Sequence, residues 1–408
     1  MKGNVVVVIF LALGSIYLVN VSMIVASLTN TTPKPRELEE LSPVRSASRN
    51  RPLPTDAIIS DQLPVYTNEM AAQAIRPAPW ICGNRNDSAI DLLTQQKPMF
   101  AFIHIYKTAG STMRSFFNTY AYICRKGWIC LQRCTDVTPS SIKSIKNWKK
   151  CEVEHAVDRN LNIEKYGVKR KLYRHVNNTV LRNSFDLFGG HTRLGVGDYI
   201  FNKSDNNINP VRHIVFLRDP LDRYISGILY QNQKKKKGWT SADFARLVKE
   251  RVLSGEASGD YWDRSLSYLL TPGQAEYFNN IKSTFTKTNT TEQLVRVKAI
   301  TAINNLMNYN VIIGMTERMS ESIEILKHIL LTNATQKDEE LLNTHGTNKT
   351  LNVSRKGHVS TSSVLDELKK DSQFMSTFKE HVKYEKMITD YAMNMHLMQH
   401  EQIQSGIN

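Results

Sequence analysis

The segment 106–112, Tyr-Lys-Thr-Ala-Gly-Ser-Thr, combines residue types that bind phosphate. The lysine supplies a full positive charge, the hydroxyl side chains donate hydrogen bonds, and the small residues Ala109 and Gly110 let an anion approach the backbone closely. A helix that begins here would add unpaired N–H groups and a partial positive charge. The pattern therefore predicts a loop that binds a phosphate and stabilises a leaving one. Its candidate residues are Lys107, Thr108, Ala109, Gly110, Ser111 and Thr112.

This loop is not a Walker A motif. That motif requires Gly-x4-Gly-Lys-Ser/Thr, in which the lysine follows the glycines, whereas Lys107 precedes Gly110 in this chain. The same residue types also occur in an ordinary turn between a strand and a helix. The residues alone leave that interpretation open.

The segment Phe102–Thr112, Phe-Ile-His-Ile-Tyr-Lys-Thr-Ala-Gly-Ser-Thr, resembles the 5'-phosphosulfate loop of the carbohydrate sulfotransferases, in particular the Golgi heparan sulfate 2-O- and 6-O-sulfotransferase group. In that family an arginine ends a later strand and a serine follows it in the next helix; Arg218 and Ser226 stand at the same spacing. The resemblance implies that these two side chains bind the 3'-phosphate of the co-substrate 3'-phosphoadenylyl sulfate (PAPS), for which a guanidinium and a hydroxyl are suitable donors. It covers roughly residues 97–395 and is specific in these two motifs.

Sulfuryl transfer also needs a base, because the acceptor hydroxyl loses its proton as its oxygen attacks sulfur. The segment Phe188–Arg193, Phe-Gly-Gly-His-Thr-Arg, resembles the Gly-His segment that carries the proposed base of the 2-O-sulfotransferase branch. The resemblance implies that His191 is the catalytic base and that Lys107 assists the leaving phosphate; a structural histidine fits the sequence as well. Arg193 is a candidate for binding a carboxylate or sulfate group of the substrate.

Two later segments resemble the family more loosely. Ile312–Arg318 is similar to a late strand and turn, and we interpret it as scaffold. Arg355 and Lys356 lie in the polar, basic segment Asn352–His358, and sulfotransferases of several branches place such a loop over the nucleotide. The resemblance implies that both residues contact PAPS. The reaction that it implies requires no metal.

The elements that would position these residues alternate in type. Short apolar runs are typical of buried parallel strands, and each is followed by a segment with an apolar helical face. The expected strands lie at residues 99–105, 211–217 and 309–314, and the expected helices lie at 113–121, 221–230 and 320–331. Alternating strands and helices predict an α/β fold. The expected class is a P-loop-like three-layer fold with a central parallel sheet, plus an N-terminal transmembrane helix.

The apolar run from Val5 to Leu28 contains no charge and is long enough to cross a bilayer. A cleaved signal peptide has a shorter apolar stretch, and the segment 26–28, Ala-Ser-Leu, is a poor cleavage site, so an uncleaved signal anchor is favoured. The proline-rich, polar segment that follows has no apolar periodicity, which is typical of a linker. The predicted parts are a cytosolic tail (1–4), a transmembrane signal anchor (5–28), a stem (29–79) and a luminal sulfotransferase domain (80–408, core about 97–395).

Sequons and cysteines both indicate the lumen of the secretory pathway. Asn-x-Ser/Thr occurs at Asn30, Asn86, Asn177, Asn202, Asn289, Asn333, Asn348 and Asn352. The cysteines are Cys82, Cys124, Cys130, Cys134 and Cys151, an odd number whose pairing the sequence leaves open. A zinc site at Cys130 and Cys134 is disfavoured. We expect a glycoprotein with disulfide bonds in the Golgi membrane, single-pass type II, with its catalytic domain in the lumen.

The formal net charge of +15 and the pI of about 9.5 suit a polyanionic partner. The expected function is transfer of a sulfuryl group from PAPS to a hydroxyl of a carbohydrate, such as the glycosaminoglycan heparan sulfate. The expected partners are an acidic glycan and the membrane, not nucleic acid, and the sequence leaves a homo-oligomer open. One alternative is a Golgi glycosyltransferase, although the sequence lacks the Asp-x-Asp metal motif. Another is a non-catalytic polysaccharide-binding membrane protein on the same fold.

Overall fold

The computed structural model describes residues 63–78, 82, 100–132, 152–157, 186–196, 211–254, 264–282, 288–331, 334–347 and 359–406. All of them belong to a compact unit that begins at Ser60. The predicted anchor, most of the predicted stem, and Arg355 and Lys356 lie outside the described residues. Within the described ranges, no helix is long and apolar enough to cross a bilayer.

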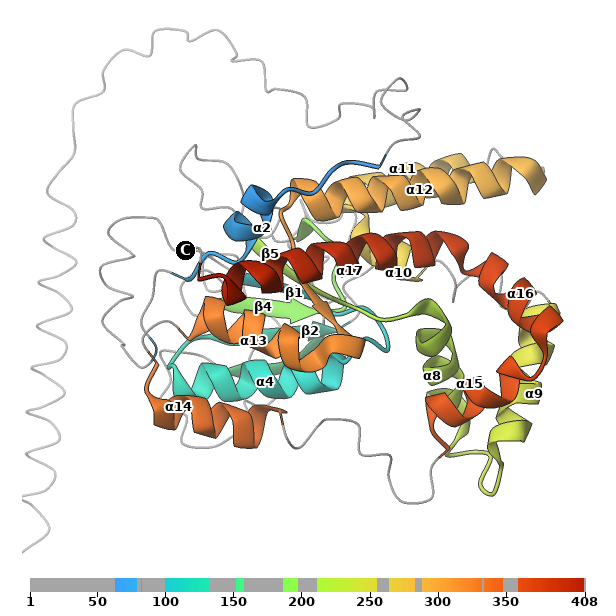
Figure 1. Ribbon diagram of the computed structural model, residues 1–408, viewed down its shortest axis with the longest axis horizontal. Coiled ribbons are helices and arrows are strands. Elements are labelled where there is room, and N and C mark those ends of the chain that lie inside the picture. The colour runs from blue at the N-terminus through green and yellow to red at the C-terminus, as the bar shows by residue number, and fades with distance from the viewer. Residues whose placement is uncertain are drawn as a thin grey trace, which may run out of the picture. The chain divides into compact units, whose positions relative to one another are not determined.

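A six-stranded sheet of order β3-β2-β4-β1-β5-β6 forms the centre of the fold (Figure 1). Its strands are β1 (Phe100–Ile103), β2 (Trp128–Gln132), β3 (Glu152–Val157), β4 (Leu187–Gly190), β5 (Arg212–Leu217) and β6 (Ile312–Met315). Five strands run parallel, and β3 pairs antiparallel with β2 at one edge. Every residue of β1, β4 and β6 is buried, as expected for parallel strands with helices on both faces. The predicted α/β fold with a central parallel sheet is confirmed.

One face of the sheet is covered by α4 (Gly110–Ile123), α13 (Met319–Leu330), α14 (Gln336–Leu341) and the π-helical turn η5 (Leu342–Thr347) (Figure 1). Helix α4 buries Met113, Phe116, Phe117 and Tyr120, whose spacing places them on one side of a helix. They pack in one apolar cluster with side chains of β1, β5 and β6. This packing fixes the start of α4 at the end of β1.

The other face is covered by α2 (Asn68–Ala74), α10 (Arg264–Leu269), α12 (Thr288–Asn308) and α17 (Lys383–Gln404), with α11 (Pro272–Lys282) beside α12 (Figure 1). Part of the segment predicted as a stem belongs to this layer. Tyr66 and Ala71 are buried in its apolar cluster, and Ala74 accepts a hydrogen bond of 2.6 Å from Arg212 of β5. The folded unit therefore begins before residue 80.

Four helices form a group beside the sheet, at the right of Figure 1: α8 (Pro220–Asn232), α9 (Ser241–Leu253), α15 (Thr361–Lys369) and α16 (Ser372–His381). They share an apolar cluster of their own. An ion pair of 2.5 Å between Arg223 of α8 and Glu385 of α17, both almost fully buried, connects this group to the helices on the sheet. Since α8 directly follows β5, the group also borders the carboxyl edge of the sheet.

A disulfide joins Cys82 to Cys124, the residue that ends α4. It attaches the segment before β1 to the helix that follows β1. Cys130 is buried in β2, whereas Cys134 and Cys151 lie outside the described residues.

Candidate active site

The carboxyl ends of four neighbouring parallel strands meet at one edge of the sheet. In the spatial order β4-β1-β5-β6, they are followed by His191, the loop at 104–109, Arg218 and Thr316. Ligands of open α/β sheets bind in the crevice outside such strand ends. The strand order therefore brings together three regions that the sequence singled out separately, and it adds Thr316, which sequence reasoning missed.

The loop between β1 and α4 has an unusual backbone. Lys107 and Ala109 both have positive φ angles, of 66° and 59°. The side chain of Thr108 is buried between them and donates a hydrogen bond of 2.9 Å to the carbonyl of Ile105. Ala109 is the N-cap residue and has no side chain that caps the helix, and the first turn of α4 contains no acidic residue. The first N–H groups of α4 thus face an environment suited to an anion.

Gly110 is required by the close approach of His104. A Cβ atom at position 110 would lie 1.5 Å from Nε2 of His104, so no other residue fits without displacement of the imidazole. His104 is buried and stacks on Phe102 of β1 with ring centroids 5.9 Å apart. Burial is the main reason that the pKa of His104 lies well below 6.5, and the nearby charges of His191, Arg114 and Lys107 lower it further. His104 is therefore a neutral ring against the start of α4.

Lys107 lies where positive charge is concentrated. Its ammonium group is 4.0 Å from the centroid of the Tyr230 ring of α8, which is a cation–π contact. Partial burial, and then repulsion from Arg218, lower the pKa of Lys107 to about 8. A bound anion would act in the opposite direction and raise this pKa, because a nearby negative charge favours the charged ammonium. The predicted phosphate ligands Lys107 and Arg218 are thus close enough to interact, although they come from different strand ends.

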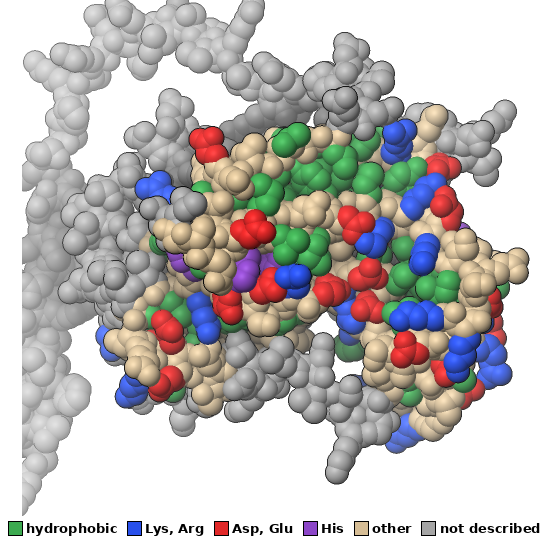
Figure 2. Space-filling model, in the orientation of Figure 1, with side chains coloured by type: hydrophobic (Ala, Val, Ile, Leu, Met, Phe, Trp, Pro, Cys, Tyr) green, Lys and Arg blue, Asp and Glu red, His purple; other side chains and the backbone are tan. Residues whose placement is uncertain are grey.

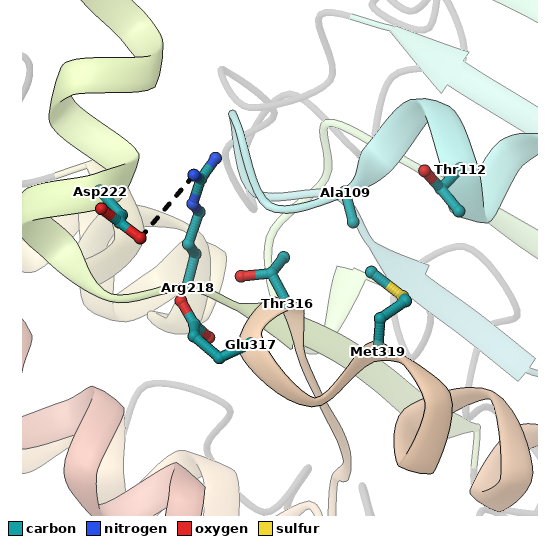
Figure 3. A pocket seen from close by; sticks show the side chains of 7 residues that line it. All are labelled: Ala109, Thr112, Arg218, Asp222, Thr316, Glu317 and Met319. Carbon is teal, nitrogen blue, oxygen red and sulfur yellow. Dashed lines mark ion pairs between the residues drawn. The ribbon is translucent and has the colours of Figure 1, made fainter. Parts of the chain in front are cut away.

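A pocket of about 360 Å³ opens between the start of α4, Arg218 and the turn after β6 (Figure 3). Its lining residues are Ala109, Thr112, Arg218, Asp222, Thr316, Glu317 and Met319. The guanidinium of Arg218 lies 3.9 Å from the Asp222 carboxylate in α8. Burial raises the pKa of Asp222 above its usual value, although Arg218 acts in the opposite direction. The size is in the range of small-molecule sites, and the cationic group comes from the predicted position.

Thr316 projects into this pocket between Arg218 and Ala109 (Figure 3). Its hydroxyl oxygen is buried, and nothing among the described residues hydrogen-bonds to it. A buried hydroxyl without a partner is costly, so a ligand atom that came within reach of it would gain a hydrogen bond. It belongs to the short 3-10 turn η4 (Thr316–Arg318), which the sequence analysis interpreted only as scaffold. The threonine lies directly after an apolar run, and this is the one signal that the sequence offered.

The carboxylates of Asp219 and Glu317, near Arg218, form hydrogen bonds that hold the local backbone. The backbone N–H of Asp219 donates a hydrogen bond of 2.8 Å to Glu317, and the Asp219 side chain accepts one of 2.9 Å from Leu221 as the N-cap of α8. These contacts fix the turn between β5 and α8, which carries Arg218. Among the described residues, no group of three or more His, Cys, Asp or Glu side chains is arranged to hold a metal ion.

His191 lies directly after β4, beside the loop that follows β1. Its ring stacks on that of His104 with centroids 4.1 Å apart, and its Nδ1 is 2.9 Å from the carbonyl oxygen of His104. A carbonyl oxygen can only accept, so Nδ1–H is the donor, and the neutral ring carries its lone pair on Nε2. The hydroxyl of Tyr268 lies 3.4 Å from the same Nδ1. The arrangement fixes the orientation and the tautomer of a potential base.

The other predicted site residues have different surroundings. The guanidinium of Arg193 donates a hydrogen bond to the carbonyl of Ser267 and so attaches the segment after β4 to α10. Ser226 is half-buried in α8 and does not line the pocket that contains Arg218. Arg355 and Lys356 lie outside the described residues. The structure thus brings His191, the 107–112 loop and Arg218 to one edge of the sheet. Of the predicted site residues, Ala109, Thr112 and Arg218 line the pocket, whereas Lys107, His191 and Ser226 do not.

No family model matches the sequence, and no curated protein is significantly similar to it.

Proposed function

We propose that this chain is a PAPS-dependent sulfotransferase that transfers a sulfuryl group to a carbohydrate hydroxyl, with a glycosaminoglycan such as heparan sulfate as the acceptor. The observation that carries the proposal is the convergence of His191, Lys107 and Arg218 at the ends of adjacent strands β4, β1 and β5. A base, a cation for a leaving phosphate and a guanidinium for a second phosphate are the groups that this reaction needs. The finer fold class that goes with the proposal is a P-loop-like three-layer fold.

The residues present are suited to PAPS as the co-substrate. The N-terminus of α4 and the loop 107–112 would hold the 5'-phosphosulfate, since they combine backbone donors with Lys107. Arg218 would hold the 3'-phosphate, which distinguishes PAPS from ATP, and the hydroxyl of Thr316 is a further donor in the same pocket. Ser226 and the pair Arg355 and Lys356 remain proposed ligands on the resemblance alone.

In the proposed reaction, Nε2 of His191 takes the proton of the acceptor hydroxyl while its oxygen forms a bond to sulfur. The bond between sulfur and the 5'-phosphate oxygen breaks on the opposite side, and the electron pair remains on that phosphate. Lys107 and the N–H groups at the start of α4 stabilise the charge that develops there. The carbonyl of His104 keeps the proton of His191 on Nδ1, so that Nε2 is ready to accept one. The site as proposed uses no metal.

The proposed location is the Golgi membrane, with a single type II anchor at residues 5–28 and the catalytic domain in the lumen. The uncharged apolar run, the eight sequons that follow it and the Cys82–Cys124 disulfide support it, because disulfides persist in oxidising compartments. The proposed partner is an acidic glycan, which agrees with the net charge of +15. Arg193 is the proposed contact to an anionic group of that acceptor.

The test is transfer of radiolabel from PAPS to a panel of desulfated glycosaminoglycans by the full chain. We expect transfer by the wild type, and loss of it in Lys107→Ala and His191→Ala at unchanged melting temperature. Full activity in these variants would contradict the roles assigned to Lys107 and His191. A wild type that neither transfers sulfate nor binds adenosine 3',5'-bisphosphate, the product nucleotide, would contradict the proposal and favour a non-catalytic polysaccharide-binding protein.

A further inference from the structure

Four consecutive lysines, Lys234–Lys237, follow the end of α8, and all four are exposed. The run has an ordered backbone. The N–H groups of Lys235 and Lys236 both donate to the carbonyl of Asn232, at 2.9 and 2.8 Å, and Trp239 N–H donates to the carbonyl of Lys236 at 3.3 Å. The four side chains are therefore held on one short turn. We call this segment the lysine turn.

The lysine turn differs from several other basic residues of the same helical group. None of its four side chains forms an ion pair or a side-chain hydrogen bond within the described part of the chain. Four basic side chains on or next to these helices are paired with carboxylates, and Figure 2 shows mixed blue and red side chains on this part of the surface. The neutralised pairs are Arg246–Asp243, Lys249–Asp371, Lys369–Asp366 and Lys370–Glu367. Four like charges without counter-charges form a local positive field that attracts a polyanion.

The lysine turn is also close to the candidate active site. Tyr230, one turn earlier in α8, is 64% exposed, and its ring holds the ammonium of Lys107 at 4.0 Å. Helix α8 ends at Asn232, two residues after Tyr230, and the lysine turn begins two residues further along the chain. The segment 230–239 contains no acidic residue. The contact of Lys107 with Tyr230 and the lysine turn thus lie at the same end of α8.

We propose that the lysine turn binds the anionic polysaccharide acceptor and directs it toward Lys107 and His191. The proposal deepens the function proposed above and rests on it. A linear glycan fits these observations better than a membrane surface. Membrane-binding segments insert exposed apolar side chains beside their basic residues. Here Lys236 covers the ring of Trp239 at 4.7 Å, and the exposed ring of Tyr230 contacts the ammonium of Lys107.

The test compares two triple variants of the full chain with the same change in charge. Lys234→Ala/Lys235→Ala/Lys237→Ala removes the lysine turn but keeps Lys236 on Trp239. The matched control, Lys370→Ala/Lys383→Ala/Lys386→Ala, removes three lysines that have carboxylate partners. Binding of a heparin oligosaccharide is measured at several salt concentrations. We expect at least tenfold weaker binding at physiological salt in the first variant, with a salt dependence shallower by roughly two ions, and less than a twofold change in the control.

Each other outcome overturns the proposal. Unchanged heparin binding in the first variant, or equal loss in both, means that the lysine turn is not a specific surface. Loss of binding to phosphatidylserine vesicles without loss of heparin binding assigns the turn to a membrane instead. Binding of adenosine 3',5'-bisphosphate, measured in parallel, separates this result from the proposed function. A wild type that binds heparin but not the nucleotide contradicts the proposed sulfotransferase. If the wild type binds the nucleotide and the first triple variant binds heparin as well as the wild type does, only this inference is contradicted.

Discussion

The imidazole rings of His104 and His191 stack with centroids 4.1 Å apart, and the carbonyl of His104 accepts a hydrogen bond of 2.9 Å from Nδ1 of His191. The two residues are 87 positions apart in the chain, and the pairing of β1 with β4 brings them together. The same His104 ring lies against Gly110 at the start of α4. One histidine thus connects the proposed base to the proposed phosphate loop.

The contact between His104 and Gly110 predicts the effect of a single methyl group. Gly110→Ala would place a carbon 1.5 Å from Nε2 of His104, so we expect the free energy of unfolding to fall by about 1–3 kcal/mol and transfer to be lost. Adding His104→Ala makes room, so the double variant should be more stable than the sum of the two single changes predicts, by at least about 1 kcal/mol. Chemical denaturation measures all three, with exposed Ser111→Ala as the control. Additive effects would show that the two residues do not touch.

The lowered pKa of His104 predicts acid sensitivity. In the unfolded chain this histidine takes up a proton as the pH falls through 6.5, whereas in the folded chain it stays neutral to much lower pH. The unfolded state then binds more protons, so stability falls as the pH drops below about 6.5, by up to about 1.4 kcal/mol per pH unit. His104→Phe keeps an aromatic ring and removes this contribution. The difference in melting temperature between pH 7.5 and 5.5 should shrink in this variant and stay as in the wild type in exposed His381→Gln.

The pKa of about 8 for Lys107 predicts how nucleotide binding depends on pH. The ammonium is charged below this value, and a bound phosphate would raise its pKa, so affinity should be constant below pH 7 and fall as the pH rises through 8. Lys107→Arg stays charged throughout and should flatten the curve. Calorimetric titration with adenosine 3',5'-bisphosphate from pH 6.5 to 9.5 measures both. Identical curves for the wild type and Lys107→Arg would mean that Lys107 does not contact the phosphate.

The sequence predicted the strands and the loop where a local pattern was strong. The run from Met99 to Ile105 contains β1, and the small residues after it mark the loop. Strand β4, Leu-Phe-Gly-Gly, was missed because two glycines indicate a turn rather than a strand. Gly189 is needed there for packing, since a Cβ would lie 2.7 Å from that of Phe102 on the neighbouring strand. Such a requirement comes from a partner 87 residues away and leaves no local signal.

The sequence also singled out only some of the residues of the candidate site. Lys107 and Arg218 were found because each lies in a motif directly after a strand. Thr316 and the role of His104 were missed, since both depend on which strand ends are neighbours in space. The sequence also did not predict the ion pair of Arg223 and Glu385, which connects the group of four helices to α17, because the two residues are 162 positions apart.

The buried Arg223–Glu385 pair predicts a large loss from a single change and a small one from a double change. Arg223→Ala leaves the Glu385 carboxylate buried without its cation, and we expect a cost of about 3–5 kcal/mol in the free energy of unfolding. Arg223→Met/Glu385→Leu removes both charges and should lie within about 1 kcal/mol of the wild type or above it. Arg246→Ala, which breaks an exposed pair with Asp243, should change stability by less than about 1 kcal/mol. Denaturant unfolding would refute the assignment if the double variant were the least stable of the three.

The hydroxyl of Thr316 predicts opposite effects on stability and on binding. Thr316→Val keeps the shape of the side chain and removes a buried oxygen that no described residue satisfies, so the protein without ligand should be as stable as the wild type or more stable by about 1 kcal/mol. A ligand phosphate or hydroxyl in the pocket with Arg218 would lose one hydrogen bond, so affinity for adenosine 3',5'-bisphosphate should fall about tenfold. Thermal unfolding and calorimetric titration give the two quantities separately. If Thr316→Val binds the nucleotide as the wild type does, Thr316 is not part of the site. If the variant is less stable than the wild type, the hydroxyl stabilises the folded protein.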